Sequence, residues 1–162
     1  CNEEQLEAAE KALRAKLNSL SLVQPEGTFR TARKEAAKLF DRKILFTENP
    51  RKVESVVFTK EGYRIKIEAV INGEQKTLYA SYKAWKRNNL YPDDFTKKYQ
   101  SVAYAMDAEA LYLSVGLINT SYKEEYSLWV NSEDKVIATW RPNVTYLPEE
   151  PDMVWKFTGT FE

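Results

Sequence analysis

The feature that most limits the fold of this chain is a change in the spacing of its apolar residues near Val53. Beyond this point apolar side chains recur at every second position, most clearly in residues 63–71. Successive side chains of a strand point to opposite faces, so this alternation predicts strands with one buried face. Asn72-Gly73 then predicts a tight hairpin turn, because both residues tolerate positive φ angles.

Further segments of the same kind continue to the end of the chain. We predict strands near residues 53–59, 63–71, 75–82, 99–107, 110–118, 122–131, 134–141 and 153–161. No helical pattern separates the strands after residue 100, and parallel strands need long crossover connections. We therefore expect antiparallel pairing.

Two helices are predicted before the strands. Residues 2–22 carry apolar side chains at spacings of three and four, which form one stripe of a helix: Leu6, Ala9, Leu13, Leu17 and Leu20. A second helix is expected over about residues 28–40, with Thr28 as its N-cap. Its inner face would hold Phe29, Ala32, Ala36 and Leu39.

These elements predict an α+β fold in one domain spanning residues 1–162, with two N-terminal helices packed on a large, mostly antiparallel meander sheet. A chain of 162 residues is long enough to bury a core of its own. The outline resembles that of cystatin-like and NTF2-like domains. The resemblance is one of architecture alone, since no sequence motif of those families is present.

The composition argues against the common catalytic and metal sites. The chain has no histidine, its only cysteine is Cys1, and it has only five glycines. A Ser-His-Asp relay and an internal disulfide are therefore excluded, and no glycine-rich phosphate-binding loop occurs. We expect a protein that is not an enzyme and that carries no metal and no cofactor.

Paired carboxylates are the remaining route to catalysis. Glu124 and Glu125 are adjacent in a predicted strand, so they point to opposite faces and cannot share a cleft. Asp107 and Glu109 are two residues apart and could share one, as a glycosidase or cation site requires. Solvated turns explain such pairs more simply.

Cations and aromatic residues interleave in the stretch from Lys83 to Lys98, and the outer face of the second helix is basic. This mixture is typical of surfaces that bind single-stranded nucleic acid or other anions. The candidate binding surface comprises Arg30, Arg33, Lys34, Lys38, Trp85, Lys86, Arg87, Tyr91, Lys97 and Lys98. It defines an alternative function, that of a cytoplasmic anion-binding or nucleic-acid-binding domain.

The net charge gives no support for a polyanionic partner, because 24 basic residues balance 24 acidic ones. Their distribution is uneven: basic residues dominate residues 1–98, and acidic residues dominate residues 105–162. Either the two parts pair with each other across the fold, or the basic part faces a partner.

Aromatic residues are unusually frequent in the predicted sheet. The set comprises Tyr104, Tyr112, Tyr122, Tyr126, Trp129, Trp140, Tyr146, Trp155, Phe157 and Phe161. They can fill the core, line a ligand cavity within a curved sheet, or form a docking surface for another protein.

The N-terminal residues Cys1-Asn2 resemble the start of mature bacterial lipoproteins, in which the first cysteine carries the lipid. The resemblance implies lipid attachment at Cys1 and a location in the bacterial cell envelope, on the periplasmic or outer surface. We therefore expect a lipid-anchored protein that binds another envelope protein or a small ligand through its sheet.

This expectation is tested by the intact mass of the protein purified from its native host. Lipid attachment predicts a mass increase that maps to Cys1 and corresponds to more than one acyl chain, because a single chain anchors a protein only marginally. An unmodified Cys1, or an encoded upstream sequence without a signal peptide, would contradict it.

Overall fold

The computed structural model describes residues 3–19, 34–89, 99–107, 109–117, 120–143 and 154–162. These segments contain two helices, α1 (Glu3–Ser19) and α2 (Lys34–Ala37). Their strands are β1 (Lys43–Phe46), β2 (Val53–Glu61), β3 (Arg64–Ile71), β4 (Glu74–Tyr82), β5 (Lys86–Asn89), β6 (Tyr99–Met106), β7 (Ala110–Leu117), β8 (Lys123–Val130), β9 (Val136–Pro142) and β10 (Trp155–Phe161).

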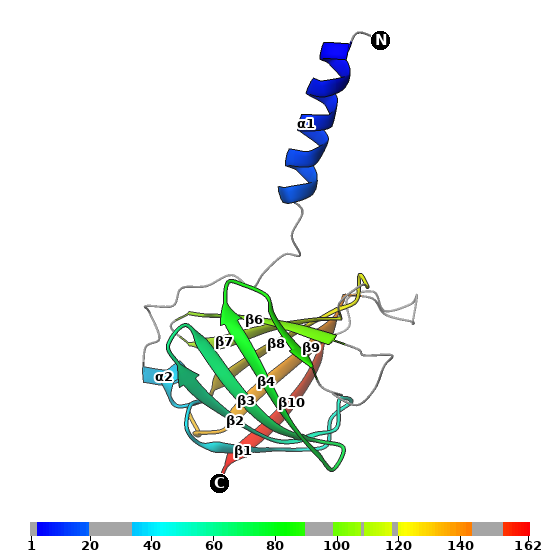
Figure 1. Cartoon of the computed structure of the whole chain (residues 1–162). Helices are drawn as coiled ribbons and strands as arrows, with labels where there is room; N and C mark the ends of the chain where they lie inside the picture. The colour runs from blue at the N-terminus through cyan, green and yellow to red at the C-terminus, as the bar shows by residue number, and fades with distance from the viewer. Residues whose placement is uncertain (1–2, 20–33, 90–98, 108, 118–119, 144–153) are drawn as a thin grey trace.

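The strands close on themselves to form a barrel (Figure 1). Neighbouring strands pair antiparallel in the order β4-β3-β2-β1-β10-β9-β8-β7-β6-β5. The circuit is completed by a short parallel pairing in which Ser81 and Tyr82 of β4 lie opposite Ala103 and Tyr104 of β6. Among the described residues, nine strands form the closed circuit, and β5 pairs with β6 beside the point of closure.

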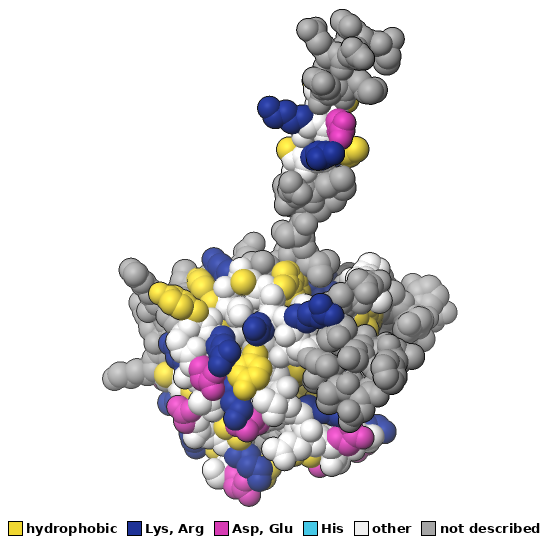
Figure 2. Space-filling view, viewed as in Figure 1, with side chains coloured by type: hydrophobic (Ala, Val, Ile, Leu, Met, Phe, Trp, Pro, Cys, Tyr) yellow, Lys and Arg dark blue, Asp and Glu magenta, His cyan; other side chains and the backbone are white. Residues whose placement is uncertain are grey.

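Because the sheet closes into a barrel, the apolar face of each strand is buried in the interior without a layer of helices packed on it. On β3 the inward side chains of Ile65, Ile67 and Ala69 are at most 6% exposed. Lys66 and Glu68, between them in the sequence, form an ion pair on the outside with an Nζ–Oε1 distance of 2.9 Å. Figure 2 shows the same mixture of basic and acidic side chains over the outer surface. The apolar face of the sheet therefore packs against itself.

A buried asparagine joins the two edges of the sheet where β4 and β5 meet. The backbone N–H of Tyr79 donates to Asn88 Oδ1 at 2.7 Å, and Asn88 Nδ2 donates to the carbonyl of Tyr79 at 2.8 Å. Asn88 also donates to the carbonyl of Lys86, and its side chain is only 6% exposed. One amide thus satisfies backbone groups that no strand pairs at this point.

The predicted packing of two helices on the sheet is wrong. The helix α1 lies where the apolar spacing predicted one, but its described side chains, at residues 8–16, are exposed, with Leu13 at 57%. Figure 1 shows α1 standing away from the barrel. The α+β outline and the cystatin-like or NTF2-like architecture are therefore replaced by a β-barrel, because the sheet covers its own apolar face. Neither described helix has the length and apolarity of a membrane-crossing segment.

The second predicted helix is represented by α2, a single turn that packs against β7 and β8. The remainder of its predicted N-terminal part, including Thr28, lies outside the described residues. The predicted burial of Ala36 and Leu39 is confirmed, since both are fully buried. Together with Phe40, whose ring packs on Phe58 at 6.3 Å, these residues close one end of the barrel.

The positions of the strands were predicted more accurately than the fold class. Each of the eight predicted strands corresponds to an observed one within three residues at either end. The hairpin turn between β3 and β4 is confirmed, with φ angles of 50° at Asn72 and 77° at Gly73. The strands β1 and β5 were not predicted, because four residues are too few to show an alternating pattern.

Replacing Asn88 by alanine should lower the free energy of unfolding by about 1–3 kcal/mol, because it leaves the N–H and carbonyl of Tyr79 buried without partners. Chemical denaturation measures this loss. The matched control is Lys86→Ala, which removes an exposed side chain from the same strand and should cost less than roughly 0.5 kcal/mol. Equal losses in the two variants would contradict a role for Asn88 in closing the barrel.

Candidate functional site: the barrel interior and its mouth

The interior of the barrel holds an apolar cavity of about 90 Å³. Its walls come from strands on all sides of the circuit and are made of aliphatic and aromatic side chains. The lining residues are Phe46, Val53, Val56, Phe58, Ile67, Ala69, Ile71, Leu78, Val102, Leu113, Val115, Tyr126, Leu128, Ala138 and Phe157.

One wall of the cavity depends on a glycine. Phe46 packs edge-on against Phe157 with ring centres 5.2 Å apart, and Gly159 pairs with Phe46 across β1 and β10. A Cβ atom at Gly159 would lie 2.7 Å from Cγ2 of Ile44 and 2.9 Å from Cδ1 of Phe46. The absence of a side chain at Gly159 therefore lets Phe46 reach the cavity.

The end of the barrel opposite α2 is its mouth, and it holds a pocket of about 330 Å³. This mouth pocket shares Ile71, Leu78, Val115 and Tyr126 with the cavity, so the apolar space lies directly beneath it. The remaining lining is polar and comprises Arg51, Asn72, Glu74, Lys76, Gln100 and Glu124.

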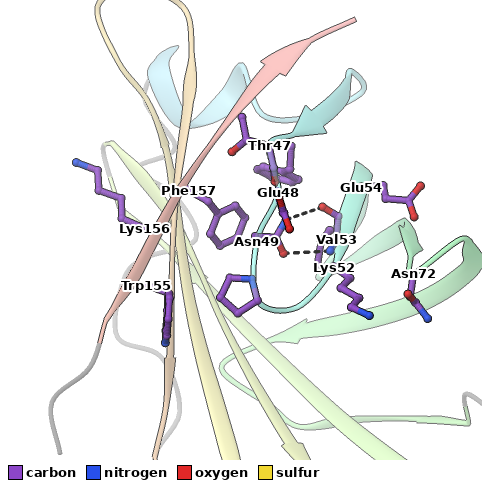
Figure 3. A pocket seen from close by; sticks show the side chains of 12 residues that line it. Thr47, Glu48, Asn49, Lys52, Val53, Glu54, Asn72, Trp155, Lys156 and Phe157 are labelled. Atoms are coloured by element: carbon purple, nitrogen blue, oxygen red, sulfur yellow. Dashed lines mark hydrogen bonds between the residues drawn. The ribbon is translucent and has the colours of Figure 1, made fainter. Parts of the chain in front are cut away.

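A second opening of about 850 Å³ lies between the loop that connects β1 to β2 and the start of β10 (Figure 3). It reaches the same apolar wall, because Phe46, Val53 and Phe157 line both this opening and the cavity. The mouth is thus divided by the loop from residues 47 to 52 into two openings onto one apolar interior.

Asn49 fixes the shape of this loop. Its Nδ2 donates to the carbonyls of Thr47 at 2.9 Å and Val53 at 2.8 Å, and its Oδ1 accepts from the N–H of Val53 at 3.1 Å. The side chain is 7% exposed, and Figure 3 shows it turned into the loop. The loop therefore presents Arg51 at a defined position in the mouth.

Arg51 reaches across the mouth to a buried carboxylate on β8. Its Nη2 lies 3.2 Å from Oε1 of Glu124, whose side chain is 3% exposed. The hydroxyl of Tyr122 donates to Oε1 of Glu124 at 2.7 Å, and that of Tyr126 donates to Oε2 at 2.9 Å. Three donors thus hold the one carboxylate, and the Arg51 guanidinium lies 5.8 Å from the ring centre of Trp140.

The protonation states of this mouth cluster, composed of Arg51, Glu124, Tyr122, Tyr126 and Trp140, follow from burial and charge. Burial opposes the charge of Arg51, but the oxygens of Tyr126 and Glu124 more than offset it and raise the pKa of the guanidinium. Burial, reinforced by the charge of Glu124, raises the pKa of Tyr126. Arg51 therefore stays charged and the Tyr126 hydroxyl stays a donor.

The opposite orientations predicted for Glu124 and Glu125 are confirmed. Glu124 lies inside the barrel at 2% exposure, whereas Glu125 lies outside and pairs with Lys123 at 2.7 Å. The importance of Glu124 was missed at the level of sequence. The signal was an acidic residue in step with the inward side chains Tyr126 and Leu128.

Asp107 and Glu109, the alternative catalytic pair, lie in the turn between β6 and β7 at the closed end. Asp107 Oδ1 accepts the N–H groups of Glu109 and Ala110, each at 2.8 Å, and Oδ2 accepts the Tyr112 hydroxyl at 2.7 Å. Burial acts against these bonds, which nonetheless lower the pKa of Asp107. The Asp107 carboxylate therefore stabilises a turn, and the side chain of Glu109 is exposed.

The predicted basic binding surface is only partly described. Arg30, Arg33, Tyr91, Lys97, Lys98 and the side chain of Lys34 lie outside the described residues. Lys38 is paired with Glu35 at 2.8 Å beside α2, whereas the exposed Lys86 and Arg87 and the half-buried Trp85 lie at β5. The helix α2 contacts β7 and β8, so these contacts do not bring Lys38 beside the candidate residues at β5. The surface stays a prediction.

The uneven charge distribution corresponds to pairing across the fold. Basic residues of the first part meet acidic residues of the last part in Lys38–Asp134, Arg42–Asp134, Lys43–Glu162 and Arg51–Glu124. The first three join the region around α2 and β1 to the C-terminal strands. The fourth lies in the mouth and is the most buried of these pairs.

The aromatic residues lie in the core, around the cavity and at the mouth. Tyr104 is fully buried, Tyr126 and Phe157 line the cavity, and Trp155 is 42% exposed at the mouth, 6.5 Å from Trp140.

Tyr146 lies outside the described residues, as does Cys1, so lipid attachment stays a prediction. No group of three or more Cys, Asp or Glu side chains in the described part of the chain is arranged to hold a metal ion.

Comparison with known proteins identifies the fold and no sequence family. No protein-family model matches the sequence, and no curated protein matches it. Solved structures do match: apo lipid binding protein 8 of Caenorhabditis elegans has a TM-score of 0.57 at 8% identity, covering 78% of this chain and 96% of that one. The barrel has the fold of these lipid-binding proteins.

Two further structures show the same similarity. A fatty acid transporter, REP1-NXSQ, has a TM-score of 0.56 at 12% identity and covers 78% of this chain and 98% of its own. The fatty-acid-binding protein of Manduca sexta has a TM-score of 0.53 at 9% identity, over 75% of this chain and 98% of its own. These similarities are to β-barrels and therefore contradict the predicted fold of two helices packed on a sheet.

The Arg51–Glu124 pair should contribute measurably to stability. A double-mutant cycle with Arg51→Met and Glu124→Gln should give a coupling energy of about 1–3 kcal/mol, because Glu124 is buried and hydrogen-bonded. The control cycle uses the exposed pair Lys135 and Glu133, with side chains 52% and 68% exposed, and should give less than roughly 0.5 kcal/mol. Equal coupling energies in the two cycles would contradict the expectation that burial makes the Arg51–Glu124 pair contribute more to stability than an exposed pair.

Proposed function

We propose that this protein binds a small apolar or amphipathic ligand inside its barrel. The apolar part of the ligand occupies the cavity and any polar part lies at the mouth. The observation that carries the proposal is the cavity itself, an apolar space of about 90 Å³ that opens directly into the polar mouth pocket.

The lining of the cavity determines what it accepts. An apolar ligand gains roughly 25 cal/mol for each square ångström of surface that leaves water. A polar ligand would lose its hydrogen bonds to water and find no replacement among side chains such as Val102, Leu113 and Leu128. The interior therefore selects for apolar groups.

The size of the cavity limits the ligand. An apolar cavity of about 150 Å³ in a folded protein takes up benzene. A space of about 90 Å³ holds only part of a chain such as hexane. The rest of the chain extends into the mouth pocket, whose wall includes Ile71, Leu78 and Val115 and whose volume of about 330 Å³ is that of a small-molecule site. The similar barrels named for lipid or fatty-acid binding support this use of the interior.

We infer binding rather than catalysis at this site. Within the described segments, Glu124 is the buried acidic residue of the interior, and its carboxylate is held by Arg51 and two tyrosine hydroxyls. A carboxylate engaged in this way positions the mouth loop. It is poorly placed to transfer a proton to a bound molecule.

Hexane is a suitable first probe, because it has no polar group. In a titration followed by NMR of ¹³C-labelled leucine and valine methyl groups, the wild-type protein should bind hexane saturably, with shifts at Val102, Leu113 and Leu128. Ala138→Leu fills part of the cavity and should weaken hexane binding at least about tenfold.

The control is Thr77→Leu, which adds the same side chain to the outer face of β4 and should leave binding unchanged. Circular dichroism and the melting temperature establish that both variants are folded. Hexane binding that is absent from the wild type, or unchanged in folded Ala138→Leu, would contradict the proposed function.

A further inference from the structure

The side chain of Arg51 extends across the mouth pocket. It starts from the loop between β1 and β2, and its Nη2 ends 3.2 Å from Oε1 of Glu124 on β8. Arg51 and Glu124 both line this pocket, and the ring of Tyr126 lines both the pocket and the cavity. A molecule that moves through the mouth pocket into the cavity therefore has to pass the contact between Arg51 and Glu124.

The loop that carries Arg51 is fixed on either side of this residue. The side chain of Asn49 bonds the carbonyl of Thr47 and both backbone groups of Val53. The N–H of Lys52 donates to the carbonyl of Asn49 at 3.0 Å, which closes a turn around Arg51. The guanidinium can therefore change position by rotation of the Arg51 side chain, while the backbone of the loop stays in place.

The two partners of the ion pair differ in their access to water. The side chain of Arg51 is 40% exposed, whereas that of Glu124 is 3% exposed. A guanidinium that turns outward is hydrated, and Glu124 keeps the hydrogen bonds from the hydroxyls of Tyr122 and Tyr126. The buried carboxylate then lacks a counter-charge, which is unfavourable. The paired arrangement is therefore the populated one, and the open arrangement can form without breaking the rest of the mouth cluster.

The second opening is a more obstructed route to the cavity. Phe46 and Phe157 line both this opening and the cavity, and their rings pack edge-on with centres 5.2 Å apart. Phe157 is only 7% exposed, although the opening beside it has a volume of about 850 Å³. Passage on this side requires two packed rings to separate, whereas passage through the mouth pocket requires one half-exposed side chain to rotate.

We infer that the Arg51 side chain is a gate over the cavity and that its pairing with Glu124 closes this gate. A ligand enters or leaves the barrel when the guanidinium turns to solvent, and the strength of the pair sets the rate of exchange. The inference rests on the proposed function, because it describes how the molecule bound in the cavity reaches it. A gate obstructs entry and exit alike, so it changes both rates more than it changes the affinity.

Arg51→Ala removes the gate. The association and dissociation rates of hexane, measured from line shapes in the methyl NMR titration, should both rise at least about tenfold in this variant. Their ratio, the Kd, should change much less than either rate. Unchanged rates in folded Arg51→Ala would overturn the inference. A rise in the dissociation rate alone would show that Arg51 contacts the bound ligand and would overturn it as well.

Glu124→Gln tests whether the pair closes the gate, because it keeps the Arg51 side chain and removes the charge that holds it. Hexane should exchange faster in this variant than in the wild type, and wild-type rates in folded Glu124→Gln would overturn the role of the pair. The double variant Arg51→Ala, Glu124→Gln removes both charges, so it provides the test if Arg51→Ala alone does not fold. It should show the same fast exchange as Arg51→Ala, and wild-type rates would overturn the inference.

The matched control is Lys43→Ala, which breaks another ion pair between the two parts of the chain, the one with Glu162 at the start of β1. It should leave both rates unchanged, and an acceleration equal to that in Arg51→Ala would overturn the inference. Trp155→Ala tests the other route, because Trp155 is 42% exposed and lines the second opening. Faster exchange in Trp155→Ala with wild-type rates in Arg51→Ala would show entry by the second opening and overturn the gate.

Failure of the gate is distinguishable from failure of the proposed function. If hexane binds the wild type and its exchange rates depend on neither Arg51 nor Glu124, the gate is overturned and the proposed function stands. If hexane does not bind the wild type, both are overturned.

Discussion

The structure depends on the meeting of β4 and β6, because this contact turns a one-sided sheet into a closed barrel. An open sheet with the same alternation would leave a row of apolar side chains facing water and two unpaired edges. Only two residue pairs join the strands directly, and the amide of Asn88 extends the junction by bonding both backbone groups of Tyr79. The cavity exists because of this closure.

Closure also explains why the two ends of the barrel differ. At one end Ala36 and Leu39 are buried without contact with solvent and complete the apolar core. At the other end the loop between β1 and β2 carries Arg51 toward Glu124 on β8, with β10 and β9 between their strands. A charge buried in an apolar barrel is costly unless it is paired, so the pair fixes the loop across the mouth. The loop in turn separates the two openings onto the interior.

The sequence predicted the strands well and their arrangement poorly. The alternation of apolar and polar side chains is local, so strands such as β3 and β4 and the turn at Asn72-Gly73 were correctly located. The pairing of Ser81 with Ala103 is non-local, and nothing in either segment specifies it. Without that pairing, the expected cover for the apolar face was a pair of helices, and the apolar stripe that includes Leu13 was wrongly assigned to the interface.

Only part of the candidate site can be predicted from the sequence. Glu124, Tyr126 and Leu128 are two residues apart on one strand, so their side chains share a face, but the sequence analysis assigned no role to Glu124. Its partner Arg51 lies in a loop, where no periodicity indicates direction, so the pair required the three-dimensional structure.

The central claim is that the barrel encloses an apolar space that small molecules can enter. A crystal structure under xenon pressure tests it most directly, because xenon occupies dry apolar cavities without needing any polar contact. The account predicts a xenon atom inside the barrel, in contact with Val102, Leu113 and Leu128, at the cavity of about 90 Å³. Crystals that bind xenon elsewhere on the protein but hold none inside the barrel would contradict it.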